Sequence, residues 1–135
     1  MKNLKTLIKL KKKDIDELKK RKSVFENMRQ EFVGETTLLK MQLEEETKLA
    51  TELADLRGFF GDYSKHIGDK QEKFAEDIAR LDKKIDILTD EMGEHFAQMK
   101  KYEIALENRK LAIKKKRQKK EQDMLDEVAA RKKRL

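Results

Sequence analysis

The chain has 135 residues, of which 45% are charged and 37% hydrophobic, and it contains no proline and no cysteine. So large a charged fraction excludes a conventional globular core, and the lack of cysteine excludes disulfides, thiol catalysis and thiolate metal sites. Proline would break a helix interior, so its absence favours long helices of the coiled-coil type. Disorder is the competing interpretation of so charged a chain, but regularly spaced apolar residues favour helices.

The first predicted helix covers about residues 3–57. Positions that follow one another at alternating steps of three and four residues from Leu4 form a seam, the stripe that a coiled coil buries. Ten of its sixteen positions are apolar. Met28 and Leu56 lie one position from polar ones and Leu49 lies one position from Ala50, which predicts gentle repacking. The seam positions are Leu4, Ile8, Lys11, Ile15, Leu18, Lys22, Phe25, Arg29, Phe32, Thr36, Leu39, Leu43, Glu46, Ala50, Leu53 and Arg57.

A bend is predicted at about residues 58–62. Gly58 and Gly61 free the backbone to turn, and Asp62 is a candidate N-cap whose carboxylate would accept the orphan amides of the next turn. Three aromatic residues cluster here, and two interpretations stay open: they plug the end of a hairpin, or they form an exposed contact. These aromatic residues are Phe59, Phe60 and Tyr63.

The second predicted helix covers about residues 63–133, with Gly68-Asp69 as an alternative start. Between Phe74 and Leu106 its seam is apolar at every position except His95. The seam positions are Phe74, Ile78, Leu81, Ile85, Leu88, Met92, His95, Met99, Tyr102, Leu106, Arg109 and Ile113.

Two helices joined by a short loop pack antiparallel. The predicted fold is therefore all-α: a single domain, residues 1–135, that forms an antiparallel coiled-coil hairpin. Folding at residue 60 places Leu4 opposite about residue 116 and leaves residues 117–135 as a single-helix overhang of nearly 30 Å. The overhang carries an apolar stripe, which predicts that it binds another protein. The alternative interpretation is that the overhang frays or dimerises. The stripe consists of Met124, Leu125, Val128 and Ala129.

Charge is distributed unevenly along the chain. Residues 1–22 carry a net charge of +7 and residues 100–120 one of +8, whereas residues 23–62 and 63–99 carry −5 and −3. A hairpin would bring the two basic segments side by side, and an acidic partner would relieve their repulsion. A merely solvated lysine-rich face is the simpler alternative. Nucleic acid and an anionic membrane surface fit less well, because the basic runs lack interleaved aromatics and a large apolar face.

No constellation of residues points to catalysis. His66 and His95 are the only histidines, and two isolated imidazoles do not make a metal site. There is no phosphate-binding glycine loop, and a two-helix rod offers no concave pocket. The prediction is a non-enzymatic protein without cofactor or metal. No apolar run approaches about 20 residues and residues 1–22 lack a signal-peptide core, which predicts a cytoplasmic protein.

Four motifs follow one another along the chain. They are the lysine-containing Leu-x-x-Leu stretch at residues 4–10, Tyr-x-x-x-Ile at residues 63–67, Lys-Lys-Tyr-Glu at residues 100–103 and Lys-Glu-Gln-x-x-Leu-Asp-Glu-x-Ala at residues 120–129. Their order resembles the flagellar type III export protein family FliJ over essentially the whole chain. Injectisome stalk proteins share the same plan and stay open, as does a generic coiled-coil scaffold or adaptor.

The resemblance implies a monomeric cytoplasmic coiled coil, similar to the stalk of the rotary ATPase gamma subunit, that is peripheral to the inner membrane through its partners. The expected partners are a hexameric export ATPase, the cytoplasmic domain of a membrane export gate and export chaperones, with no nucleic acid. From the distribution of charge, rather than from the resemblance, we expect the basic end with the overhang to enter the ATPase ring and the bend to face the gate, and the reverse assignment stays open. The expected partner-binding residues are Lys114, Lys115, Lys116, Arg117, Glu121, Gln122, Leu125, Asp126, Glu127, Phe59, Phe60 and Tyr63.

Overall fold

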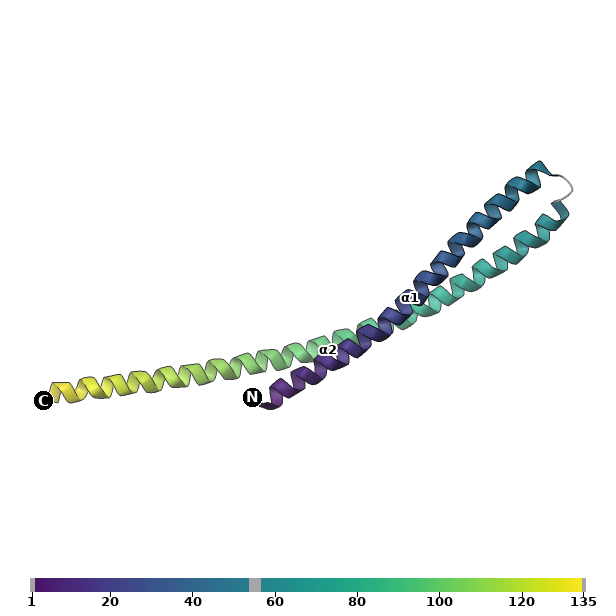
Figure 1. Cartoon of the computed structure of the whole chain (residues 1–135). Coiled ribbons are helices and arrows are strands. Elements are labelled where there is room, and N and C mark those ends of the chain that lie inside the picture. The colour runs from purple at the N-terminus through teal and green to yellow at the C-terminus, as the bar shows by residue number, and fades with distance from the viewer. Residues whose placement is uncertain (1, 54–56, 135) are drawn as a thin grey trace. The chain divides into compact units, whose positions relative to one another are not determined.

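The computed structural model describes residues 2–53 and 57–134. These residues form two long helices, α1 over Lys2–Glu52 and α2 over Arg57–Arg134, and include no strand. The helices pack against each other in antiparallel directions (Figure 1), so the predicted all-α hairpin is confirmed.

The contacts group the chain into two compact units, each built from a stretch of both helices. Unit 1 consists of Met1–Asp16 with Gly93–Leu135, and unit 2 consists of Glu17–Met92, which includes the hairpin end. Unit 1 holds 20 basic and 9 acidic side chains, whereas unit 2 holds 14 and 18. Unit 1 is therefore net positive and unit 2 net negative. That residues 1–135 form a single domain stays a prediction.

The predicted seam of α1 is the face that α1 packs inward. Every seam position from Leu4 to Ala50 is buried or half-buried, the polar positions included, but the next predicted position, Leu53, is 51% exposed. Met28 and Leu49 are 39% and 42% exposed, so the predicted repacking toward them is wrong. Leu56 lies outside the described residues. The three-four spacing, rather than polarity, decides which side chains face the partner helix.

The seam of α2 is longer toward the N-terminus than the sequence indicated. The positions from Phe74 to Leu106 are all buried or half-buried, as predicted. Steps of three or four residues continue the seam backward through Gln71, Ile67 and Tyr63 to Phe60, and none of these four side chains is fully exposed. The hairpin end is therefore part of the packed helix pair.

The predicted bend at residues 58–62 is wrong. Helix α1 ends at Glu52 rather than near residue 57, and α2 already begins at Arg57. Among the described residues no glycine has a positive φ, so Gly58 and Gly61 lie in ordinary helix. Asp62 lies inside α2 and is not its N-cap.

Packing explains why α2 continues through the two glycines. Each glycine costs a helix about 1 kcal/mol relative to alanine. Burying a large apolar side chain contributes about 1.5–3 kcal/mol, and the helical path places Phe60, Tyr63 and Ile67 on the seam, with Ile67 only 3% exposed. The burial outweighs the propensity cost, so the turn lies before the glycines.

The earlier bend changes which residues face each other. In unit 2 the ring centroid of Phe32 lies 5.6 Å from that of Phe74, whereas folding at residue 60 would place Phe32 opposite about residue 88. Leu4 correspondingly no longer faces residue 116, and all residues from 107 to 134 are exposed. The overhang, defined from here on as residues 107–134, begins ten residues earlier than predicted and is about 40 Å long.

The longer overhang also corrects the predicted charge arrangement. Of the basic segment 100–120, residues 107–120 lie on the exposed overhang and only residues 100–106 lie in the paired part of unit 1. The two basic segments are therefore not side by side along their length. In Figure 1 the yellow-green end of α2 extends beyond the start of α1 as a single helix.

Two polar seam residues of α1, Lys11 and Arg29, have partners across the helix pair. In unit 1 the Nζ atom of Lys11 lies 3.2 Å from Nδ1 of His95, and Oδ2 of Asp14 lies 4.0 Å from the same nitrogen. In unit 2 the Nε–H group of Arg29 donates a 2.5 Å hydrogen bond to Oδ1 of Asp82. These pairs offset part of the cost of placing charge on a buried face.

Candidate partner-binding surfaces

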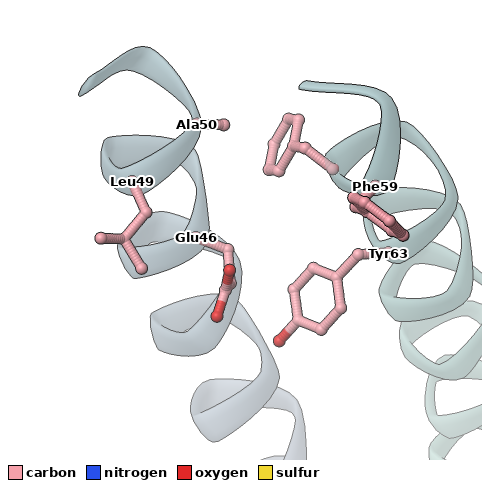
Figure 2. Close-up of a pocket in the computed structure, with 6 residues that line it drawn as sticks. Glu46, Leu49, Ala50, Phe59 and Tyr63 are labelled. Atoms are coloured by element: carbon pink, nitrogen blue, oxygen red, sulfur yellow. The ribbon is translucent and has the colours of Figure 1, made fainter. Parts of the chain in front are cut away.

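The first candidate surface is a cleft at the hairpin end of unit 2. Antiparallel packing brings residues 46–50 of α1 opposite residues 59–63 of α2 (Figure 2). The space between them, here named the tip cleft, has a volume of about 160 Å³. It is lined by Glu46, Leu49, Ala50, Phe59, Phe60 and Tyr63.

The three aromatic residues at this end differ in exposure. Phe60 and Tyr63 are half-buried on the seam of α2, whereas Phe59 is 76% exposed. In Figure 2 the Tyr63 hydroxyl and the Glu46 carboxylate both point into the space between the helices. The aromatic residues thus close the end of the helix pair in part and leave one ring open to solvent.

Sequence reasoning missed the contribution of α1 to this surface. Glu46 and Ala50 were identified as seam positions, and Leu49 as a neighbour of one, but none was expected to face the aromatic residues. The misplaced bend is the cause, because folding at residue 60 puts Glu46 opposite about residue 74. The backward continuation of the α2 seam to Phe60 is the signal that locates the turn correctly.

The second candidate surface is the overhang of unit 1. Its residues 109–120 include eight basic and no acidic side chains, and all are exposed. The predicted site residues Lys114, Lys115, Lys116 and Arg117 belong to this run, here named the basic run. No ion pair between any of these four and another described residue is found, so their charges face solvent.

An apolar groove follows the basic run. Met124, Leu125 and Val128 are 66%, 64% and 50% exposed, and together with Glu121 they line a shallow groove, here named the overhang groove. The spacing of these four residues is i, i+3, i+4 and i+7, which places them on one face of a helix. Two of the predicted site residues, Glu121 and Leu125, therefore belong to one surface.

The other predicted tail residues lie outside that groove. The Nε2 amide of Gln122 donates a 3.0 Å hydrogen bond to Oδ1 of Asp126. Glu127 is 3.9 Å from the guanidinium of Arg131. Both contacts join residues four apart on an exposed helix, and each stabilises such a helix by about 0.2–0.5 kcal/mol. These residues support the helix that presents the groove.

Fold and surfaces define the protein as a two-helix antiparallel coiled coil with an exposed helical extension. No protein-family model, curated protein or solved structure matches the chain. Its membership of the FliJ family therefore stays a prediction. Neither α1 nor α2, over the described residues, contains a stretch apolar and long enough to cross a membrane.

Proposed function

We propose that this chain is a non-enzymatic coupling stalk of the flagellar type III protein export apparatus. In this role the overhang binds the hexameric export ATPase, and the hairpin end meets the export gate. The protein also handles export chaperones, acts as a monomer, and works in the cytoplasm at the inner membrane. The observation that supports the proposal is the overhang itself, with 28 consecutive exposed helical residues.

The overhang has the chemistry of a helix that docks into a groove. Its anchors Met124, Leu125 and Val128 share one face, which is the pattern by which amphipathic helices bind apolar grooves. The adjacent basic run would accelerate encounter with an acidic surface. Most helical stability in proteins comes from tertiary packing, which the overhang lacks, so a partner that covers the groove would also stabilise the helix.

The dimensions of the overhang suit insertion into a ring. A single helix with its side chains is about 10–12 Å wide, so it enters an opening that a helix pair does not. Helix α2 is one uninterrupted helix of 78 residues that starts at the hairpin end and finishes in the overhang. A displacement at the overhang would therefore be passed along one continuous ladder of backbone hydrogen bonds.

Removal of the overhang tests the proposal. A chain that ends at residue 106 is expected to lose co-purification with the hexameric export ATPase while the remaining residues keep their helicity by circular dichroism. The double variant Met124→Ser/Leu125→Ser should weaken binding at least tenfold. Leu111→Ser, at a residue that is 48% exposed and outside the overhang groove, is the matched control and should bind normally.

Two outcomes would contradict the stalk. Undiminished ATPase binding by the chain that ends at residue 106 would remove the overhang from the interface. A stable parallel dimer in analytical ultracentrifugation would also contradict it, because a coupling stalk is an asymmetric monomer. That result would favour a general coiled-coil scaffold.

The basic run supports one rival function, binding to nucleic acid. Eight basic side chains without an acidic one resemble the electrostatic footprint of a phosphate-binding surface. If they contact phosphates, affinity for any duplex should fall about 10³–10⁵-fold between 50 and 200 mM salt. The variant Lys114→Gln/Lys115→Gln/Lys116→Gln would abolish that binding, whereas Met124→Ser/Leu125→Ser would not. The stalk proposal expects no such salt-dependent binding.

A further inference from the structure

We propose that the tip cleft is a binding site for an arginine side chain of a partner polypeptide. The proposal concerns unit 2 and does not depend on the coupling role assigned to the overhang. It follows from the state of Glu46, the rings beside it and the charge around it.

Glu46 differs from the other polar seam residues of α1. It is half-buried, yet no hydrogen bond or ion pair joins its carboxylate to a residue whose side chain the structure describes, a set that leaves out Arg57. A carboxylate that faces a cleft in this way can accept hydrogen bonds from a cation that enters it. The other polar seam residues between Leu4 and Ala50 are each bonded to a described residue: Lys11 to His95, Lys22 to Glu26, Arg29 to Asp82, and Thr36 to the carbonyl of Phe32.

The rings around Glu46 select the kind of cation. Phe59, Phe60 and Tyr63 line the cleft together with the carboxylate. A guanidinium is planar and weakly hydrated, stacks on aromatic faces and bonds a carboxylate through two parallel N–H groups. Unit 2 already contains a cation–aromatic pair, with the Nζ atom of Lys84 5.4 Å from the ring centroid of Phe25. The tip cleft offers both features that arginine uses.

The size of the cleft favours one side chain over a free ligand. Its volume of about 160 Å³ is below the roughly 300–1,000 Å³ of pockets that hold small molecules and cofactors. Phe59, which lines the cleft, is 76% exposed, so an arginine projecting from a protein surface can reach the lining. Residues 41–62 hold six acidic and two basic side chains, so the surrounding charge complements a cationic partner.

A fluorescence titration on the full chain tests the site. The protein has no tryptophan and two tyrosines, so the variant Tyr102→Phe leaves Tyr63 as the single fluorophore. The probes are Nα-acetyl-arginine methylamide and its neutral isostere Nα-acetyl-citrulline methylamide, both added at millimolar concentrations. The arginine probe should change Tyr63 emission saturably, and the citrulline probe should bind at least tenfold more weakly.

A matched pair of variants assigns the effect to the cleft. Glu46→Gln should weaken the arginine probe at least tenfold, with unchanged far-ultraviolet circular dichroism. Glu45→Gln removes the same charge from an exposed neighbour that does not line the cleft, and should leave binding within about twofold. Equal binding of both probes, no saturable response, or an unaltered affinity in Glu46→Gln would each overturn the proposal. Because the titration contains no ATPase, its failure would leave the overhang experiment unaffected.

Discussion

Helix α2 contains two regions that differ in how their apolar side chains are covered. In unit 2, Leu81 and Leu88 are 5% and 7% exposed, whereas Leu125 on the overhang is 64% exposed. The paired region therefore gains stability from burial against α1, and the overhang is held only by helix propensity and pairs four residues apart. A continuous helix can thus combine a self-sufficient part with a part whose apolar side chains lack an intramolecular partner.

The largest expected difference between the two regions is the change in the free energy of unfolding when one leucine in each is truncated to alanine. Leu81→Ala should lower the free energy of unfolding by about 2–3 kcal/mol, because it removes a buried side chain and leaves a cavity. Leu125→Ala should change it by less than about 0.5 kcal/mol, as at other exposed positions. Urea denaturation followed by circular dichroism measures both values. Equal effects of the two substitutions would contradict the difference in burial.

A substitution of glycine by alanine, with a smaller expected effect on stability, tests helix propensity apart from burial. Gly34 lies on the exposed face of α1 in unit 2, and a Cβ atom added there meets nothing within 4 Å. Gly34→Ala should therefore raise the midpoint of thermal unfolding through a stabilisation of about 0.5–1 kcal/mol.

The reverse substitution on the overhang is the matched control. Ala112→Gly should lower the helical signal in circular dichroism without moving the unfolding midpoint of the paired residues, because Ala112 is exposed and unpaired with α1. If it moved that midpoint by as much as Gly34→Ala does, the overhang would not be energetically separate from the paired region.

The smallest expected effect concerns the Arg29–Asp82 pair. Their side chains are 40% and 48% exposed, so solvent screening limits the coupling to about 0.2–1 kcal/mol. A double-mutant cycle with Arg29→Ala and Asp82→Ala measures it. The coupling should decrease in 1 M salt, where screening extends over only about 3 Å. A coupling that does not change with salt would indicate a packing contribution instead.

The packed faces could be read from the sequence, because a period of three and four residues leaves a direct trace in residue order. Even Lys11 and Glu46, which are polar, were correctly placed on the seam of α1. The turn could not be read in the same way. Gly58 and Gly61 allow the backbone to turn, but a turn forms there only if it does not cost buried contacts. Here the helical path buries the seam side chains from Phe60 onward, so the helix continues.

The misplaced turn also determined which candidate surface could be found. The overhang groove lies on one helix, so the spacing of Met124, Leu125 and Val128 was sufficient to identify its apolar side. The tip cleft is formed by both helices, and it requires the pairing of residues 46–50 with residues 59–63. A shift of several residues in the turn removes that pairing from any prediction, although every contributing residue is visible in the sequence.

The polar seam pairs have a further consequence for how α1 and α2 align. Suppose that α1 slid along α2 by one heptad in unit 2, which would keep apolar residues facing apolar residues. Arg29 would then leave Asp82 and face Ala75 or Thr89, seven residues to either side, and the ion pair with Asp82 would be lost. The pair therefore favours the observed alignment, by its coupling of about 0.2–1 kcal/mol, over neighbouring alignments that a seam of leucines alone would tolerate.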